Sequence, residues 1–203
     1  MNKYEMLGLF TVPLLLIKFD NHYKYNFPEV EKKDQKPYTW RVPLHTTFPN
    51  IGDDDPIVST EVRDNLSKDL LETIVNVFGE IGIPTNISFS NIWYNIYHDN
   101  QGQEKHNHIP MVGSSNPFWS GIYYNKNTSN TEFFRSDKLY LTQLFTGYEQ
   151  TPMKDCLAES VMPIVEDGDI VLFPPYLEHS VKSKLEHKNK MRMTFSFNID
   201  LNL

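Results

Sequence analysis

The sequence has a single cysteine, Cys156, so it cannot form a disulfide within the chain. This usage fits a reducing compartment. Cys156 lies in a polar, loop-like stretch with no helix-start signal and with Lys154 as its nearby cation. Thiols become reactive in more electropositive surroundings, so we expect Cys156 to take no part in chemistry.

Long hydrophobic runs are also absent. The longest apolar stretch, residues 6–17, is interrupted by a glycine, a threonine and a proline and is closed by Lys18. It is shorter than the ~20 residues that a membrane-spanning helix needs. Glu5 precedes it and no small-residue cleavage site follows, which argues against a signal peptide. We therefore expect a cytoplasmic protein with no membrane partner.

Positive charge is scarce as well. The chain has 19 Lys and Arg against 26 Asp and Glu, a formal net charge of -7, and its basic residues gather only in the short run 182–190. Binding to duplex nucleic acid requires a basic face, so we expect no such partner. At 203 residues the chain is long enough for one sizeable core. We expect a single domain, 1–203, with a strand, an arm and a supporting helix in 1–84 and a β-rich core in 85–203.

The first part of the chain predicts one helix. Residues 8–20 have the pattern of a strand, and the proline-rich segment 21–57 that of a loop or arm. Apolar residues then recur at helical spacing after Ser59 and Thr60, which are suitable N-caps, and glycines and a proline end the segment by residue 84. We expect this helix to pack on a sheet.

After residue 84 the hydrophobic period changes from helical to two. The pattern predicts eight short strands, over 87–98, 106–112, 118–125, 132–134, 161–165, 169–174, 179–182 and 191–199. In the last of them apolar residues alternate with Arg192, Thr194, Ser196 and Asn198, so one face is apolar and the other polar. Many short strands behind one helix favour a mainly β protein with a supporting helix, such as a jelly roll that holds a ligand at its mouth.

Three histidines are candidate metal ligands. His106 and His108 stand at i and i+2 of a predicted strand, so their imidazoles project from the same face and can reach one metal ion. His179 follows a turn, an apolar strand and the double proline at 174–175, which turns the chain back toward the same mouth. Without a metal, the pair would be two solvated imidazoles on an edge strand. Other histidines stand alone and are weaker candidates: His22, His45, His98 and His187.

Arg192 and Thr194 are candidates for binding an anion. Their shared face on the last strand places a guanidinium and a hydroxyl together. A planar guanidinium fits a carboxylate with two parallel hydrogen bonds. The alternative is a structural salt bridge between Arg192 and an acidic residue.

Together these motifs resemble those of 2-oxoglutarate- and Fe(II)-dependent oxygenases. The motifs are His106-x-His108, the strand 120–124, the Gly168-Asp169 turn with its apolar strand, His179, and Arg192-x-Thr194. The resemblance covers about residues 85–200 and is strongest to a family of oxygenases found in phages of marine cyanobacteria and in some bacteria. It implies a double-stranded β-helix of the cupin-like kind, and host cytoplasm as the location if the source is viral.

The resemblance also implies roles for particular residues. His106 matches the first histidine of the iron-binding motif, and His179 the distal histidine. Arg192 matches the arginine that binds the distal carboxylate of 2-oxoglutarate, with Thr194 as the neighbouring hydroxyl. Tyr124 and Asn95 are candidates to complete the co-substrate pocket. The implied activity is hydroxylation of a substrate, a protein side chain or a small molecule, with decarboxylation of 2-oxoglutarate to succinate.

One position departs from the usual pattern, because His108 stands where these enzymes usually have a carboxylate. Three histidines also describe a zinc site, so the identity of the metal stays open. The second ligand stays open too, since a carboxylate could come from Glu104, Asp99 or Glu178 instead of His108.

Two other hypotheses remain. One is a cupin-like metalloprotein that does not use 2-oxoglutarate, although the glutamate usual a few residues after His-x-His is missing here. The other is a non-catalytic jelly-roll module that metal stabilises. Nothing in the sequence indicates the substrate or the oligomeric state. Six aromatic residues either line a substrate entrance or pack in the core: Phe118, Trp119, Tyr123, Phe133, Phe134 and Tyr176.

Overall fold

The computed structural model describes residues 4–9, 12–31, 41, 44–48, 57–98, 100–109, 116–126, 131–136, 158–183 and 191–202. Within these residues the strands are β1 (Tyr4–Leu9), β2 (Val12–Lys18), β3 (His45–Thr46), β4 (Ile87–Tyr97), β5 (Gln103–His106), β6 (Trp119–Lys126), β7 (Thr131–Phe134), β8 (Ser160–Val161), β9 (Asp169–Phe173), β10 (His179–Val181) and β11 (Arg192–Leu201). A 3-10 helix, η1 (Asp20–Lys24), follows β2, and one α-helix, α1 (Thr60–Ile81), precedes β4.

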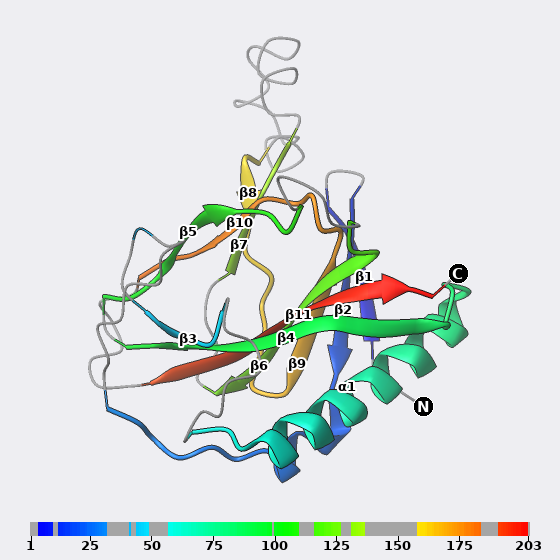
Figure 1. Ribbon diagram of the computed structural model, residues 1–203. Helices are drawn as coiled ribbons and strands as arrows, with labels where there is room; N and C mark the ends of the chain where they lie inside the picture. Colours follow the sequence, from blue (N-terminus) through cyan, green and yellow to red (C-terminus); the bar gives the residue numbers. More distant parts are fainter. Residues whose placement is uncertain are drawn as a thin grey trace, which may run out of the picture.

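The strands form two antiparallel sheets that face one another (Figure 1). The larger sheet has the order β1-β2-β9-β6-β11-β4-β3, and the smaller has the order β5-β10-β7-β8. From β4 onward the chain passes repeatedly from one sheet to the other, so strands distant in sequence become neighbours. This topology is a double-stranded β-helix, which confirms the predicted mainly β fold with one supporting helix.

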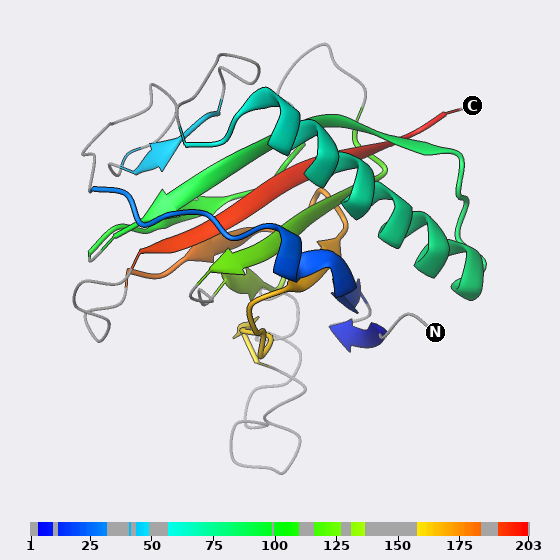
Figure 2. The same cartoon turned by 90° about the horizontal axis from the view of Figure 1, so that it is seen from below.

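Helix α1 begins and ends where the sequence predicts. The Ser59 side chain accepts a hydrogen bond from the backbone N–H of Val62, and Gly82 ends the helix in the left-handed region at φ 77°. The buried side chains of the helix recur at helical spacing: Leu66, Leu70, Ile74, Val77 and Phe78. They pack in one cluster with apolar residues of the larger sheet, and the helix lies across the outer face of that sheet (Figure 2).

The alternation in β11 gives the larger sheet two different faces. Met193, Phe195 and Phe197 belong to the apolar cluster that includes α1. The intervening side chains therefore point toward the smaller sheet, and they are polar: Arg192, Thr194, Ser196 and Asn198. All four are buried. The interior between the two sheets thus has a polar wall.

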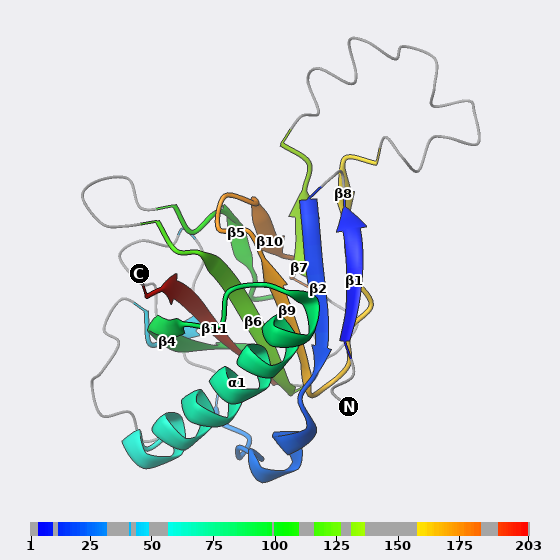
Figure 3. The same cartoon turned by 90° about the vertical axis from the view of Figure 1, so that its right-hand side faces the viewer.

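The N-terminal prediction was wrong in detail. The single strand expected over 8–20 is a hairpin, in which β1 pairs with β2 in antiparallel register and β2 in turn pairs with β9 (Figure 3). The expected arm contributes η1 and the short strand β3, which pairs with β4. No helix within the described residues is long and apolar enough to span a membrane.

Candidate metal centre

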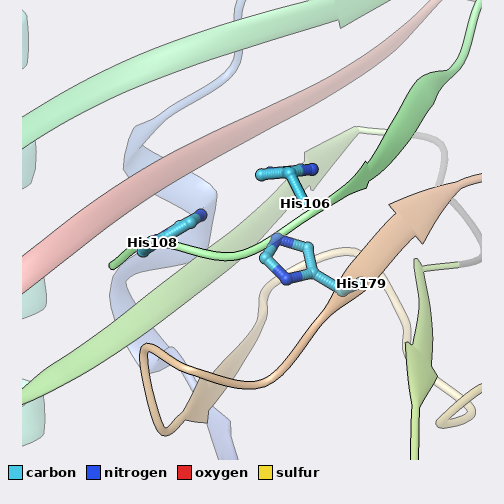
Figure 4. Close-up of side chains that lie close together, drawn as sticks. All are labelled: His106, His108 and His179. Carbon is cyan, nitrogen blue, oxygen red and sulfur yellow. The ribbon is translucent and has the colours of Figure 1, made fainter. Parts of the chain in front are cut away.

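Three imidazoles converge in the interior between the sheets (Figure 4). They belong to His106 at the end of β5, His108 just after it and His179 at the start of β10. One nitrogen from each lies within 4.8 Å of the other two, a grouping that is able to hold one metal ion. His106 and His179 are cross-strand partners, and their ring centroids are 4.3 Å apart. The sequence prediction that these three residues come together is therefore met by the fold.

Hydrogen bonds fix the orientation of two of these rings. The Nδ1 atoms of His106 and His179 lie 2.8 Å and 3.1 Å from the carbonyl oxygens of Glu104 and Leu177. A carbonyl oxygen can only accept, so each Nδ1 must carry the proton. Each Nε2 then carries the lone pair that a metal needs.

His108 is held differently, by a side chain of the opposite sheet. Its Nδ1 lies 2.8 Å from Oδ1 of Asn198 on β11. The same Oδ1 accepts a hydrogen bond of 2.8 Å from the Ser120 hydroxyl on β6. The backbone N–H of His108 donates to the carbonyl oxygen of Pro175 at 2.8 Å, which ties this residue to the double-proline corner before β10.

All three imidazoles are kept neutral. Burial lowers the pKa of His106 below its ordinary value. Burial, together with the neighbouring His106, lowers the pKa of His108 to about 4. Burial also lowers the pKa of His179 well below its ordinary value, and the other two imidazoles add to this effect. At pH 7 the three rings are therefore uncharged and able to act as ligands.

The strand predicted to carry the histidine pair differs from the observed one. We expected a strand over 106–112, but β5 ends at His106, and His108 lies in an irregular segment. The common face is therefore not a property of strand alternation alone. It results from the anchors of His108 to Pro175 and Asn198.

Two of the alternative carboxylates have other partners. The Glu104 carboxylate accepts a hydrogen bond of 2.7 Å from the backbone N–H of Arg41. Glu178 forms an ion pair of 2.6 Å with Lys105. Asp99 lies outside the described residues, as does Cys156. Among the residues that the structure places, the cluster consists of the three imidazoles.

Aromatic rings surround the histidines on the inner side. Phe173 stacks edge-on against His179 at 4.8 Å and against His108 at 5.6 Å, and Phe133 lies 5.7 Å from His179. Trp93 of β4 lies 5.6 Å from His108, and its indole N–H has no hydrogen-bond partner among the described residues. If a metal bound to the three histidines, these aromatic rings would limit the access of water to it.

Of the six aromatic residues with two possible roles, four pack in the core: Phe118, Trp119, Tyr123 and Phe133. Phe118, Trp119 and Tyr123 pack on the helix side of the larger sheet and belong to the core. Phe133 packs against His179 in the interior, Phe134 lies under the Lys105 ammonium group at 4.6 Å, and Tyr176 is 46% exposed.

Three of the predicted co-substrate residues lie in one row across the larger sheet. Thr194 of β11 is the register partner of Asn95 on β4 and of Tyr124 on β6. All three are buried. The Tyr124 hydroxyl donates to Thr131 Oγ1 at 2.8 Å, and the Asn95 amide bridges Thr46 and Ser196. The fold thus joins residues that are up to 99 positions apart in the sequence (194 minus 95).

Arg192 lies two residues along the same face and is 5% exposed. Its guanidinium donates to the carbonyl oxygens of Gln101 at 2.9 Å and Lys182 at 3.4 Å, and lies 5.2 Å from the centre of the Tyr97 ring. These contacts fix the direction of the guanidinium. The structure therefore places a buried guanidinium beside the row of hydroxyl and amide groups.

Several residues of this site were not singled out in the sequence. Tyr97 is the register partner of Arg192 and hydrogen-bonds Gln103 at 3.0 Å. Ser120 and Trp93 also face the interior. The alternation in the last strand placed Asn198 on the polar face, so the sequence indicated that its side chain points inward. Its contact with His108, however, joins residues 90 positions apart. No local pattern contains such a contact.

Comparisons with known proteins show which family this chain matches. Residues 91–198, just over half of the chain, match the family described as "Putative 2OG-Fe(II) oxygenase". A search of curated proteins found no match.

Among solved structures, EvdMO1 is similar with a TM-score of 0.51 and 11% identity, covering 86% of this chain and 40% of that one. HygX from Streptomyces hygroscopicus, with nickel and 2-oxoglutarate bound, has a TM-score of 0.49 and 15% identity over 79% of this chain and 74% of that one. A Pseudomonas putida prolyl-4-hydroxylase has a TM-score of 0.48 and 12% identity over 79% and 78%. At such low identity, the EvdMO1 similarity concerns the fold alone.

Proposed function

This chain belongs to the 2OG-Fe(II) oxygenase family, and from that premise we propose that it is an Fe(II)- and 2-oxoglutarate-dependent dioxygenase that hydroxylates an unidentified substrate. The observation that carries the proposal is the cluster of three neutral imidazoles between the sheets, in a fold whose larger sheet also holds a buried guanidinium, that of Arg192. The substrate is a protein side chain or a small molecule. The chain's net charge of -7 argues against a duplex nucleic acid.

His106, His108 and His179 would hold the iron through their Nε2 atoms. The hydrogen bonds at Nδ1 and the lowered pKa values support this choice, because both leave Nε2 with a lone pair at neutral pH. With His108 in place of a carboxylate, the protein ligands add no negative charge, which favours an anionic co-substrate. When bound, Fe(II) would activate molecular oxygen, the oxidant of the reaction: one oxygen atom goes to the substrate C–H bond, and the other goes to 2-oxoglutarate, which is oxidised to succinate and carbon dioxide.

Arg192 would bind the distal carboxylate of 2-oxoglutarate. Carbonyl contacts orient its guanidinium, and burial strengthens its attraction for an anion. Thr194 and Tyr124 offer hydroxyl groups in the same row. Asn95 supports that row, because its amide already bridges Thr46 and Ser196.

The proposal is tested by anaerobic titration of the purified protein with Fe(II) and then 2-oxoglutarate. We expect a visible charge-transfer band that requires both, and thermal stabilisation by 2-oxoglutarate only when metal is present. Arg192→Ala should weaken 2-oxoglutarate binding by at least about 100-fold, the loss expected for a buried charge-assisted pair, and should leave metal affinity within a few-fold. Arg63→Ala, on helix α1, is the matched control.

Two results would count against this function. If 2-oxoglutarate adds no stability and no absorption to the metal-loaded protein, the chain is a metal-stabilised module or a cupin-like enzyme that does not use this co-substrate. If Arg192→Ala binds 2-oxoglutarate as the wild type does, the assignment of the guanidinium is wrong.

A further inference from the structure

Among the described residues, the Nδ1 atom of the middle histidine, His108, has a different kind of partner from those of the other two. The Nδ1 atoms of His106 and His179 bind backbone carbonyls two residues earlier in their own segments, at Glu104 and Leu177. The Nδ1 of His108 binds a side chain, the Asn198 amide, which comes from the opposite sheet. The orientation of this ring is therefore set by residues that a substitution can change.

We propose that Asn198 and Ser120 form a positioning pair that fixes the tautomer and the orientation of His108, so that its Nε2 faces the metal. This inference rests on the proposed function only in that the bound group is the metal of that site. Neither residue would touch substrate or 2-oxoglutarate.

The chemistry of the amide explains the need for two residues. A side-chain amide has an oxygen that accepts and a nitrogen that donates, and rotation by 180° about the last side-chain bond exchanges them. With Oδ1 toward His108, the imidazole must carry its proton on Nδ1 and keep the lone pair on Nε2. With Nδ2 toward His108, the imidazole would adopt the opposite tautomer, and Nε2 would carry a proton where the metal should bind.

Ser120 favours the first arrangement. Its hydroxyl donates to the same Oδ1 at 2.8 Å, so two donors converge on one oxygen. Ser120 and Asn198 are 0% and 9% exposed, and they are register partners on β6 and β11. Inside the protein, water cannot readily replace either hydrogen bond.

The first test measures affinity for Zn²⁺ and Co²⁺, alone and without co-substrate, by competition with a chelator. Asn198→Leu keeps the approximate shape but removes the acceptor, and should weaken both metals about 10- to 100-fold, as other losses of an outer hydrogen bond to a ligand do. Asn198→Asp keeps an acceptor and adds a negative charge, and should bind at least as tightly as the wild type. Asn125→Leu, a buried amide of β6 that bonds Tyr25 and Tyr123 away from the site, is the control and should stay within about twofold of the wild type.

The second test is a double-mutant cycle. Ser120→Ala in the wild-type background frees the amide to rotate and should weaken metal binding several-fold. In the Asn198→Asp background the same change should have little effect, because both carboxylate oxygens accept and rotation exchanges nothing. Additive losses would show that Ser120 acts only through packing.

The third test reads the tautomer directly in the metal-free protein. Two-bond ¹H–¹⁵N correlation spectra at pH 7.5 should show His108 protonated on Nδ1 in the wild type and in Asn198→Asp. They should show mixed tautomers in Asn198→Leu. A wild-type His108 protonated on Nε2, or an Asn198→Leu variant with unchanged tautomer and metal affinity, would overturn the proposal. The Asp variant and the cycle keep it testable if Asn198→Leu does not fold.

The spectra also separate this inference from the proposed function. A protein with the expected tautomer and metal affinities but no response to 2-oxoglutarate would contradict the function and leave the positioning pair intact. The opposite tautomer in a protein that gives the charge-transfer band would contradict the positioning pair alone.

Discussion

At the scale of single residues, the candidate site depends on burial of polar groups that would be costly without partners. His179 and Arg192 are 2% and 5% exposed, and each has hydrogen bonds to backbone carbonyls that fix its direction. Such hydrogen bonds hold a buried polar group in one orientation, because water does not compete for the same donors and acceptors. The protein's own hydrogen bonds therefore orient these groups of the site.

Of the three histidines, His108 can be substituted with the least risk to the fold, because it lies outside the strands. We expect His108→Ala to lower metal affinity by more than about 100-fold, since loss of a direct ligand should exceed the loss of an outer hydrogen bond. Chelator competition gives the affinity, and circular dichroism checks the fold. The neighbouring Asn107→Ala, at an exposed position, should bind metal normally. Unchanged affinity in His108→Ala would assign the second ligand elsewhere.

The lowered pKa values of the three histidines predict an acid-sensitive apoprotein. Each imidazole binds its proton less readily in the folded chain than in the unfolded chain, so between the two pKa values the unfolded state carries more protons. The free energy of unfolding should therefore fall as the pH falls below ~6.5, the ordinary histidine value, and continue to fall toward about 4 for His108. Urea denaturation of the metal-free protein from pH 7.5 to 4.5 measures this. A stability that rises over this range would contradict the assignment.

At the scale of elements, the close approach of β6 to its neighbours depends on a glycine. A Cβ at Gly121 would overlap the Phe197 ring and lie 2.8 Å from a Leu172 methyl group, whereas a Cβ at Gly79 in α1 would meet only an ordinary contact of 3.7 Å with Thr85. A residue without a side chain is therefore needed at position 121 in the sheet, whereas position 79 in the helix has room for a methyl group.

These two glycines predict stability changes of opposite sign. Gly121→Ala should lower the free energy of unfolding by about 1–3 kcal/mol, because the core is already filled. Gly79→Ala should raise it by about 0.5–1 kcal/mol, because alanine loses less backbone freedom in a helix. Chemical denaturation followed by circular dichroism measures both. A neutral Gly121→Ala would mean that β6 and β11 are less tightly packed than described.

At the scale of the whole molecule, the candidate site links the two sheets. His106 and His179 belong to the smaller sheet, and His108 is hydrogen-bonded to β11 of the larger one. A metal bound to all three would therefore tie together segments that come from both sheets. Metal binding would stabilise the folded state only, because the unfolded chain does not hold the three histidines together.

Metal should consequently stabilise the whole fold. At a free Zn²⁺ or Mn²⁺ concentration of 100 times Kd we expect a gain of about 2.7 kcal/mol in the free energy of unfolding, provided that the unfolded chain binds little metal. Thermal unfolding with metal and then with excess chelator measures the gain and its reversal. The gain should be largely absent in His108→Ala. Equal stabilisation of both proteins would place the metal at another site.

Some features of this protein followed from local sequence alone. Helix α1, with its Ser59 cap and its spaced apolar face, and the alternation of β11 both depend on residues within a few positions of one another. The three histidines and the arginine could be singled out because their residue types and spacing suit a metal and an anion. The resemblance to a family then gave them roles.

Other features required the tertiary structure. The end of β5 at His106, the hairpin of β1 and β2, and the row formed by Asn95, Thr194 and Tyr124 depend on sheet order and register. So does the Asn198 contact that orients His108. Side-chain periodicity is set by the backbone of one segment and can be read locally. The partner across a sheet is set by the packing of segments tens of residues apart, and only the folded chain decides it.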